Sequence, residues 1–286
     1  MTNSLQEILI KALDEDTPVN DITSELLITK DSVVTAIIIA KENGIFFGVE
    51  IINEIFKLVD RSVKVRILKK DGDVVNNRDT IASFEGSIKT ILKVERVLLN
   101  LLQRLSGVAS TTNKYVNKVN NPKIKIMDTR KTTPLFRKWE KAAVVAGRGF
   151  NHRHSLSDMV LIKENHISGF LKKNSIDQLP ALFKNFKKEN PNIKIEIEIE
   201  TIEQLENYNL EDVDFIMFDN FSKDQIITGL NVCKQKKYKA EIEVSGNVTL
   251  ENISTYSDLD IDRISIGSLT HSVKALDLSL LINSDS

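Results

Sequence analysis

The sequence predicts an α/β protein in which a mixed α+β segment precedes a parallel sheet. After residue 107 the chain alternates apolar strand candidates with amphipathic helical segments, and this alternation is typical of parallel sheets and barrels. Before residue 107, helices and strands follow one another without such regularity. The 286 residues, of which 41% are hydrophobic and 28% charged, can form one large domain or two smaller ones.

Composition disfavours several other classes of protein. The net charge of -1, the pI near 6.5 and an aromatic content of only 6% disfavour a nucleic-acid binder. No apolar run approaches the ~20 residues of a membrane span, and the first residues do not resemble a signal peptide. The single cysteine, Cys233, cannot form an internal disulfide, which fits a reducing cytoplasm.

The first hundred residues predict a scaffold that carries little chemistry. Apolar periodicity indicates helices at 4–13 and 50–59 and strands at 35–40, 45–49, 62–68 and 80–86. A longer helix is expected from 87 to 105, and Gly107 should end it. The polar stripe of this helix includes Lys89, Lys93 and Arg96, and solvated surface is the ordinary interpretation of such lysines.

Six strand candidates follow, and charged or small residues stand where they stop. In parallel α/β folds the ligand site lies at the carboxyl ends of the strands, because the loops converge there. The candidates are residues 123–127, 159–163, 193–199, 214–218, 240–244 and 262–266.

One segment, residues 128–167, concentrates positive charge. It holds eight Lys and Arg residues against four Asp and Glu residues, and three of the four histidines of the chain. Such a local excess of cations indicates an acidic ligand. The histidines His152, His154 and His166 lack neighbouring cysteines and the spacing of a closed zinc site, so zinc is disfavoured.

The strand candidate at 193–199 places several glutamates on one side. Glu196, Glu198 and Glu200 alternate with isoleucines, so in a barrel they would point inward, where charge needs a compensating cation. Glu198 together with Asp219, at the end of the next strand, would suit Mg²⁺. Glu196 and Glu200 remain alternatives as the metal partner, and an exposed edge strand is the alternative for the whole pattern.

Small residues follow the last two strand candidates. Ser245, Gly246 and Asn247 follow one, and the segment 267–271 follows the other. Small residues allow backbone N–H groups to approach a phosphate closely, and barrels often bind phosphate at these loops. We therefore expect a sugar phosphate to bind here.

At these residues the chain resembles the quinolinate phosphoribosyltransferases, also called carboxylating nicotinate-nucleotide pyrophosphorylases. The resemblance covers nearly the whole chain. It is carried by TRKTTP at 129–134, NHR at 151–153, DMVLIKENHI at 158–167, FDN at 218–220 and the SGN and IGSLTHS segments near the end. It implies an incomplete parallel α/β barrel at 107–271 joined to an N-terminal α+β sandwich at 1–106, on which the tail 272–286 packs.

The resemblance also implies a reaction. Phosphoribosyl diphosphate and quinolinate would give nicotinate mononucleotide, diphosphate and CO₂ in NAD synthesis, with Mg²⁺ as cofactor and no nucleic acid or membrane partner. A cytoplasmic homodimer or higher oligomer with shared active sites is expected, in which Arg96 enters the neighbouring subunit's site. A molybdenum-transport-associated homologue and a nicotinate phosphoribosyltransferase-like enzyme are the alternatives within the same class.

The site residues implied by the resemblance fall into groups. Catalytic roles are expected for Lys131, Lys163, Glu198 and Asp219, the last two on the metal or the ribose, with Lys131 facing the diphosphate. Quinolinate would be bound by Arg96, Arg130, His152, Arg153 and Lys163, because guanidinium groups bind planar carboxylates in two-pronged fashion. Asn165 and His166 would lie behind these residues. The substrate-binding set is completed by Thr129, Ser245, Gly246, Asn247, Ile266, Gly267 and Ser268.

Three residues depart from the pattern of the family. Leu135, Arg148 and Ser155 each stand where that pattern has glycine. A side chain does not readily adopt every backbone conformation that glycine allows, so these loops are expected to differ in geometry.

Overall fold

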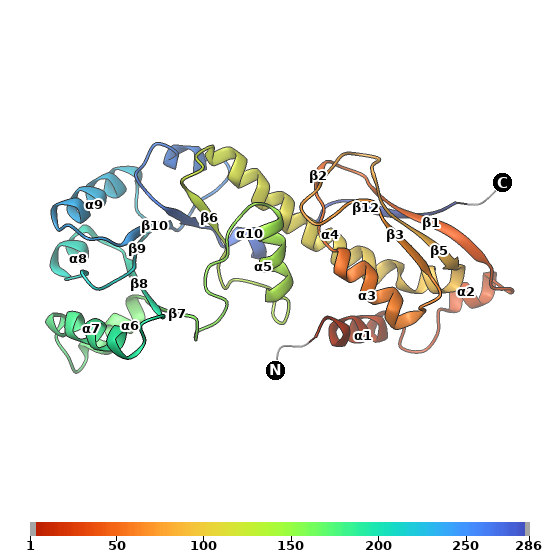
Figure 1. Ribbon diagram of the computed structural model, residues 1–286, viewed down its shortest axis with the longest axis horizontal. Coiled ribbons are helices and arrows are strands. Elements are labelled where there is room, and N and C mark those ends of the chain that lie inside the picture. The colour runs from red at the N-terminus through yellow and green to blue at the C-terminus, as the bar shows by residue number, and fades with distance from the viewer. Residues whose placement is uncertain (1–3, 284–286) are drawn as a thin grey trace. The chain divides into compact units, whose positions relative to one another are not determined.

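The computed structural model describes residues 4–283 and divides into two compact units (Figure 1). Of the described residues, the first unit contains 4–113, 132–148 and 269–283, and the second contains 114–131 and 149–268. The segment 132–148 therefore belongs to the first unit, although it lies between parts of the second in sequence. The boundaries expected from the sequence, 1–106 and 107–271 with a tail at 272–286, stay a prediction.

The first unit is built on an antiparallel four-stranded sheet of order β12-β1-β5-β3, with a separate pair β2-β4. Its strands are β1 (Val33–Ala40), β2 (Gly44–Ile45), β3 (Lys64–Ile67), β4 (Val74–Val75), β5 (Thr80–Ser87) and β12 (Leu278–Asn283). Its helices are α1 (Leu5–Asp16), α2 (Ile22–Leu27), α3 (Val49–Val59), α5 (Arg137–Ala146), most of α10 (Ser268–His271) and most of α4 (Ile88–Val119), which continues into the second unit.

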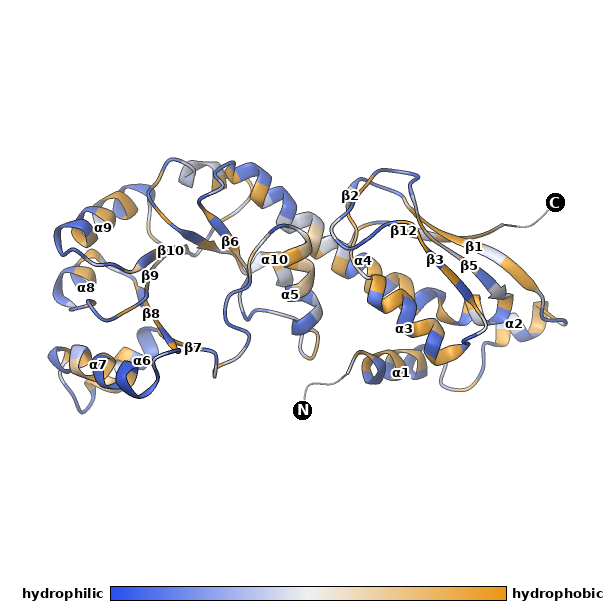
Figure 2. Ribbon diagram, in the orientation of Figure 1, coloured by the Kyte–Doolittle hydropathy of each residue, from blue (hydrophilic) through white to orange (hydrophobic). Residues whose placement is uncertain are grey.

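The core of this unit forms where the apolar sides of β1, β5 and α3 are buried. Ile38 of β1 and Ile55 of α3 have no exposed surface, and the rings of Phe56 and Phe84 lie 4.8 Å apart. Figure 2 shows hydrophobic stretches along both β1 and α3. Burial of each such side chain contributes about 1.5–3 kcal/mol. The helix predicted at 50–59 and the strands at 35–40, 62–68 and 80–86 are thereby confirmed within a few residues.

Two details of the first unit differ from the prediction. The strand expected at 45–49 ends at Ile45, because the N–H groups of Gly48 and Val49 donate to the Asp71 carboxylate, 2.7 and 3.1 Å away, and α3 begins there. Helix α4 does not end at Gly107 but continues to Val119. A Cβ atom at Gly107 would lie 2.4 Å from the carbonyl oxygen of Lys274, so this glycine permits a close backbone approach.

Strand β12 adds the far end of the described chain to the first sheet. It pairs antiparallel with β1, with Leu280 opposite Ile38 and Leu278 opposite Ala40. The Gln103 amide of α4 donates to the Leu278 carbonyl over 2.8 Å, which fixes the entry into the strand. Residues 278–283 are therefore an integral part of this sheet.

The second unit is a six-stranded sheet of order β6-β11-β10-β9-β8-β7, in which each neighbouring pair is parallel. All six predicted strands are present: β6 (Lys125–Met127), β7 (Met159–Ile162), β8 (Lys194–Ile199), β9 (Phe215–Asp219), β10 (Glu241–Ser245) and β11 (Arg263–Ser265). The helical segments between them are α6 (Glu164–Leu171), η1 (Ile176–Gln178), α7 (Leu179–Glu189), α8 (Ile202–Asn207), α9 (Lys223–Gln235) and η2 (Ile253–Tyr256).

This sheet is the predicted incomplete α/β barrel. It is open, with β6 and β7 as its outer strands, and α8 and α9 lie outside β8 to β10 (Figure 1). Strand β8 lies between β9 and β7, so the alternative of an exposed edge strand for residues 193–199 is wrong. Within residues 4–283, no helix combines the length and the apolar character needed to cross a membrane.

Candidate active site

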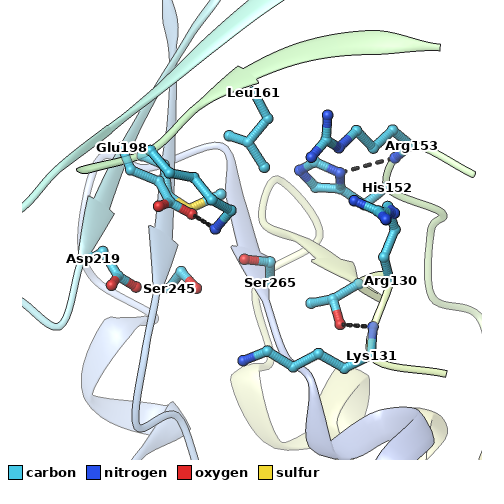
Figure 3. Close-up of a pocket in the computed structure, with 12 residues that line it drawn as sticks. Arg130, Lys131, His152, Arg153, Leu161, Glu198, Asp219, Ser245 and Ser265 are labelled. Carbon is cyan, nitrogen blue, oxygen red and sulfur yellow. Dashed lines mark hydrogen bonds and ion pairs between the residues drawn. The ribbon is translucent and has the colours of Figure 1, made fainter. Parts of the chain in front are cut away.

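A cavity of about 390 Å³ lies at the carboxyl ends of the second unit's strands (Figure 3). It is formed where polar residues follow or end each strand, as the position of ligand sites in parallel folds requires. Arginines lie on one side of it and carboxylates on the other. Its lining consists of Thr129, Arg130, Lys131, His152, Arg153, Leu161, Lys163, Glu198, Met217, Asp219, Ser245 and Ser265.

The basic side begins just after β6. The Thr129 hydroxyl accepts the N–H of Lys131 over 3.0 Å and bends the chain so that Arg130 and Lys131 both reach the cavity. Burial is the main cause that lowers the pKa of Arg153, and the positive charge of Arg130 lowers this pKa further. Two guanidinium groups held close together in a partly buried cavity favour an anionic ligand, because an anion relieves their repulsion.

The segment carrying His152 and Arg153 is held beside β6 by backbone and side-chain bonds. The buried Asp128 carboxylate accepts the N–H of His152 over 2.9 Å. His152 Nδ1 accepts the N–H of Arg153 over 2.8 Å, and the Arg153 guanidinium donates to the Met159 carbonyl over 3.0 Å. These bonds fix the direction of the Arg153 side chain before any ligand arrives.

The acidic side is made by Glu198 of β8 and Asp219 of β9. Burial raises the pKa of Glu198, and the nearby charge of Asp219 raises it further, whereas Lys163 lowers it. The Lys163 ammonium donates to a Glu198 carboxylate oxygen. Oxygen ligands of this kind suit a divalent cation such as Mg²⁺, and a cation would offset the repulsion between the two carboxylates.

A second layer of charge lies deeper on the same strands. His152 Nε2 is 2.9 Å from Glu196 Oε2 and 3.6 Å from Glu243 Oε1, and Arg263 Nε is 3.4 Å from Glu243 Oε2. Both carboxyl groups have no exposed surface, and burial raises the pKa of each to about 7. The Arg263 guanidinium also stacks 3.5 Å over the Phe215 ring, so this layer contains its own cation.

The loops after β9 and β10 are built against each other. Gly246 has φ 88°, and a Cβ there would lie 2.1 Å from Asn220 Oδ1, so only glycine fits. The Asn220 N–H donates to the Ser245 carbonyl over 2.9 Å, and the Asn247 amide donates to Asn220 Oδ1 over 3.0 Å. The interlocked loops hold Asp219 and Ser245 at the edge of the cavity.

The structure brings nine of the predicted site residues into one cavity. They are Thr129, Arg130, Lys131, His152, Arg153, Lys163, Glu198, Asp219 and Ser245. The other predicted residues do not line it. Arg96 is exposed on α4 in the first unit, and the remainder are Gly246, Asn247, Ile266, Gly267 and Ser268.

The two residues expected behind the site differ in their roles. His166 Nδ1 accepts the N–H of Lys163 over 3.0 Å and so holds the start of α6. Asn165 is exposed and donates to Glu164. Glu200, an alternative metal partner, is exposed after the end of β8 and does not line the cavity.

Sequence reasoning missed some residues that contribute to this site. Leu161, Met217 and Ser265 line the cavity, and Leu161 and Met217 stand two positions before Lys163 and Asp219 respectively. The alternation of a strand could have identified these two, because residues two apart share a face. The same alternation in Glu241 and Glu243 was the signal for the deeper layer.

Two of the three residues expected to replace glycines of the family pattern take the left-handed conformation. Leu135 has φ 65° and Arg148 has φ 68°. The conformation costs such residues roughly 1–2 kcal/mol relative to their ordinary backbone. Ser155 is not among the residues with positive φ, and its hydroxyl donates to Asp158 over 2.7 Å.

Together, the fold and the cavity define an α/β-barrel enzyme for small anionic substrates. Residues 108–281 match the family described as "Quinolinate phosphoribosyl transferase, C-terminal domain", and residues 21–106 match "Quinolinate phosphoribosyl transferase, N-terminal domain". The chain belongs to the quinolinate phosphoribosyltransferase family.

Named relatives are similar along nearly the whole chain. The probable nicotinate-nucleotide pyrophosphorylase [carboxylating] of Bacillus subtilis is 41% identical over 96% of this chain and 92% of its own. The chloroplastic nicotinate-nucleotide pyrophosphorylase [carboxylating] of Arabidopsis thaliana is 37% identical over 99% of this chain and 84% of its own. The crystal structure of nicotinate-nucleotide pyrophosphorylase from Ehrlichia chaffeensis superposes with a TM-score of 0.88 at 36% identity, covering 99% of this chain and 100% of that one.

Proposed function

We propose that this protein is a carboxylating nicotinate-nucleotide pyrophosphorylase. It transfers phosphoribosyl from phosphoribosyl diphosphate to quinolinate and releases CO₂, giving nicotinate mononucleotide for NAD synthesis. The observation that carries the proposal is a single cavity of about 390 Å³ that joins two guanidinium groups to a pair of carboxylates. The names of the relatives agree with this activity.

The basic side suits the pyridine dicarboxylate. Quinolinate is a planar dianion, and Arg130 and Arg153 can each donate two parallel hydrogen bonds to a carboxylate. Lys163 adds a third cation at the edge of the cavity. Binding in this way would orient the ring nitrogen toward the ribose, which lowers the entropic part of the barrier.

The acidic side suits the sugar diphosphate and its metal ion. Glu198 and Asp219 would hold Mg²⁺, which supplies charge neutralisation of the departing diphosphate. Of the three candidate glutamates, only Glu198 lines the cavity together with Asp219, and this supports it over Glu196 and Glu200. Lys131 faces the diphosphate, and the loops at 245–247 and 266–268 would bind the sugar phosphate.

The reaction forms two bonds and breaks two. The pyridine nitrogen donates its lone pair to the ribose carbon as the carbon–oxygen bond to diphosphate breaks. The electron pair of that broken bond leaves with diphosphate. The bond from the ring to the adjacent carboxylate then breaks, CO₂ departs, and a proton takes its place on the ring carbon. Cations near the diphosphate stabilise the charge that develops on this leaving group, and the positively charged ring nitrogen stabilises the electron pair that remains on the ring carbon when CO₂ departs.

A comparison of acceptors tests the proposal. Diphosphate release from phosphoribosyl diphosphate should be fast with quinolinate, slower by orders of magnitude with nicotinate, and negligible without an acceptor, because a monoacid leaves cations of the site unbalanced. Excess EDTA should stop the reaction. Comparable kcat/KM values for the two acids would assign the protein to the nicotinate-type enzymes instead.

We further propose that two chains share each active site. Arg96 is exposed on the first unit and does not line the cavity, so it would act in a neighbouring chain of a symmetric dimer. Mixing inactive Arg96→Ala and Lys163→Ala chains should then restore roughly a quarter of the sites, because half of the dimers are mixed and one of their two sites is intact. No recovery, with subunit exchange confirmed by mass, would contradict sharing.

The cellular compartment is also a proposal. The single, buried Cys233 accords with a cytoplasmic enzyme. The Arabidopsis relative is named chloroplastic, so likeness to the relatives does not by itself assign the cytoplasm to this chain. Localisation of the tagged full chain by microscopy or fractionation would test the cytoplasmic assignment.

A further inference from the structure

The side chain of Lys163 turns toward the acidic side of the cavity. Its ammonium group contacts a carboxylate oxygen of Glu198, although we assign Lys163 to the quinolinate carboxylates. The side chain of Glu198 is 8% exposed and that of Lys163 is 45% exposed. The buried carboxylate is therefore the fixed partner, and the ammonium lies at the end of a flexible stem that can turn elsewhere.

The backbone of Lys163 is anchored, whereas its side chain is a flexible stem that contacts Glu198 only through the terminal ammonium group. Its N–H donates to His166 Nδ1 over 3.0 Å at the start of α6, directly after β7. Four side-chain torsions separate this anchor from the ammonium group. Lys163 can consequently exchange one partner in the cavity for another without a change in the fold.

Glu198 has two competing partners. A divalent cation held by Glu198 and Asp219 would repel the ammonium that Glu198 accepts in this structure, because two positive charges would share one carboxylate. Without such a cation, Lys163 is the positive group that offsets the paired carboxylates. The cation and the lysine are thus alternatives at the same oxygen atoms.

We propose that Lys163 links the two halves of the cavity: a divalent cation on Glu198 releases Lys163, which then binds a carboxylate of the pyridine substrate. The inference rests on the proposed function, since it takes the dicarboxylate and the cation from it. Its consequence is positive coupling between the two ligands before any reaction occurs. Linkage requires the coupling to be reciprocal, so quinolinate also tightens the binding of Mg²⁺.

Simple charge addition would also couple the two ligands, because a dication attracts a dianion without the help of Lys163. The two explanations differ in the absence of metal. Replacing Glu198 removes the partner that holds Lys163, whereas replacing Asp219 removes an equal charge that does not contact it. Charge alone predicts similar effects of the two replacements, and release of Lys163 predicts a much larger effect of the first.

Calorimetric titration of the full chain with quinolinate, in EDTA and without phosphoribosyl diphosphate, distinguishes charge addition from release of Lys163. Glu198→Gln should bind quinolinate roughly tenfold more tightly than the unmodified chain, the effect of one charge-assisted hydrogen bond. Asp219→Asn should change the affinity by less than about threefold. Glu198→Ala, which has no acceptor, should show at least the gain of Glu198→Gln.

The double variant Lys163→Ala/Glu198→Gln completes the cycle. Compared with Lys163→Ala alone, the double variant should bind quinolinate less than about twofold more tightly, because the lysine that would be released is absent. Added Mg²⁺ should tighten quinolinate binding to the unmodified chain and have a much smaller effect on Glu198→Gln.

Two results would overturn the inference while leaving the proposed function intact. One is a gain in quinolinate affinity in Asp219→Asn equal to that in Glu198→Gln. The other is a gain in quinolinate affinity from Glu198→Gln that persists when Lys163 is replaced by alanine. Failure of every variant and of the unmodified chain to bind quinolinate, with or without Mg²⁺, would instead refute the proposed function and the inference with it. Near-identical far-ultraviolet circular dichroism of all variants verifies that they are folded.

Discussion

Glu198 and Glu196 stand two residues apart on the same side of β8, yet they belong to different environments. Glu198 reaches the cavity, where its neighbours are a half-buried lysine and a second carboxylate. Glu196 has no exposed surface and faces His152 and Glu243. Burial raises the pKa of both groups, so the pKa alone does not distinguish them. What distinguishes them is access: only the upper glutamate can exchange its partner for a ligand.

The comparison indicates how one strand can serve both chemistry and stability. The upper layer consists of the charged residues that line the cavity, and the lower layer is the deeper layer described above. Partners in the upper layer can move, which a binding site requires. The lower layer packs its charges among His152, Glu243 and Arg263, so a change there disturbs the position of His152 and the stability of the barrel. Three predictions test this division, and a fourth concerns residues outside it.

The largest effect is expected at Glu198. Glu198→Gln should lower kcat/KM for phosphoribosyl diphosphate about 10³-fold, because it removes a charged ligand of the cation and of the developing charge. Steady-state kinetics with quinolinate at saturation measure this. Glu200→Gln, at an exposed position of the same segment, is the matched control. A larger loss in Glu196→Gln than in Glu198→Gln would move the metal partner two residues along the strand and end the proposed division.

The second prediction concerns the basic side of the upper layer. Arg153→Ala should reduce the preference for quinolinate over nicotinate by about 10²-fold, since the second carboxylate loses its fork of donors. Arg153→Lys keeps the charge without the fork and should recover only part of the preference. The ratio of kcat/KM for the two acids is the measurement. An unchanged ratio in Arg153→Ala would remove this residue from the recognition of the second carboxylate.

The third prediction concerns the lower layer and its response to pH. The pKa values of Glu196 and Glu243 lie near 7 in the folded chain, above the ordinary value of 4.5, so the folded chain binds more protons than the unfolded chain between these pH values. The free energy of unfolding should therefore fall as pH rises from 4.5 to 7. Carboxylates with a lowered pKa, such as Asp158, change the free energy of unfolding only below about pH 4. They therefore do not mask the fall in stability between pH 4.5 and 7.

Replacing Glu243 reveals how much this residue contributes to the pH dependence of stability. Glu243→Gln cannot ionise, so its stability should fall less over the same range, and the difference between the two chains should reach about 3 kcal/mol at most. Denaturant unfolding at pH 5 and pH 7 measures this. Parallel pH profiles for both chains would show that the pair is not held protonated by the fold. Glu200→Gln, at an exposed position outside this layer, is the control.

The smallest effects are expected outside both layers, where backbone conformation alone is at stake. Leu135→Gly and Arg148→Gly should each stabilise the chain by about 1 kcal/mol, because glycine adopts positive φ without steric cost. Ser155→Gly has no such strain to relieve and should not stabilise. Thermal unfolding of the three variants provides the comparison. Equal shifts in all three would show that relief of positive φ is not the source of any gain.

Local patterns were sufficient to predict most of the barrel. The strands at 193–199 and 240–244 alternate apolar and charged residues, and that period is a property of the strand itself. The polar residues that follow them, such as Ser245, marked the carboxyl ends where the cavity lies. The resemblance to the family, and not these patterns, supplied most of the individual site residues, and nine of them meet there because parallel strands place all of these ends on one side.

What the sequence could not provide depends on contacts between distant segments. Gly107 predicts the end of a helix on local rules, but the Lys274 backbone passes so close to it that glycine is needed inside the helix. In the same way, Asp71 ends the expected strand at 45–49, although it stands more than twenty positions away. The partners of Glu243 are equally remote, since Arg263 and His152 come from other strands and loops.

The pairing of β12 with β1 also has a consequence for synthesis of the chain. During translation β1 emerges early, whereas β12 follows only after the whole parallel sheet has been made. Until then one edge of β1 offers unpaired N–H and C=O groups to other nascent chains, and such edges promote aggregation. The first unit, although it begins first, can be completed only last, so this edge of β1 stays unpaired while the barrel folds.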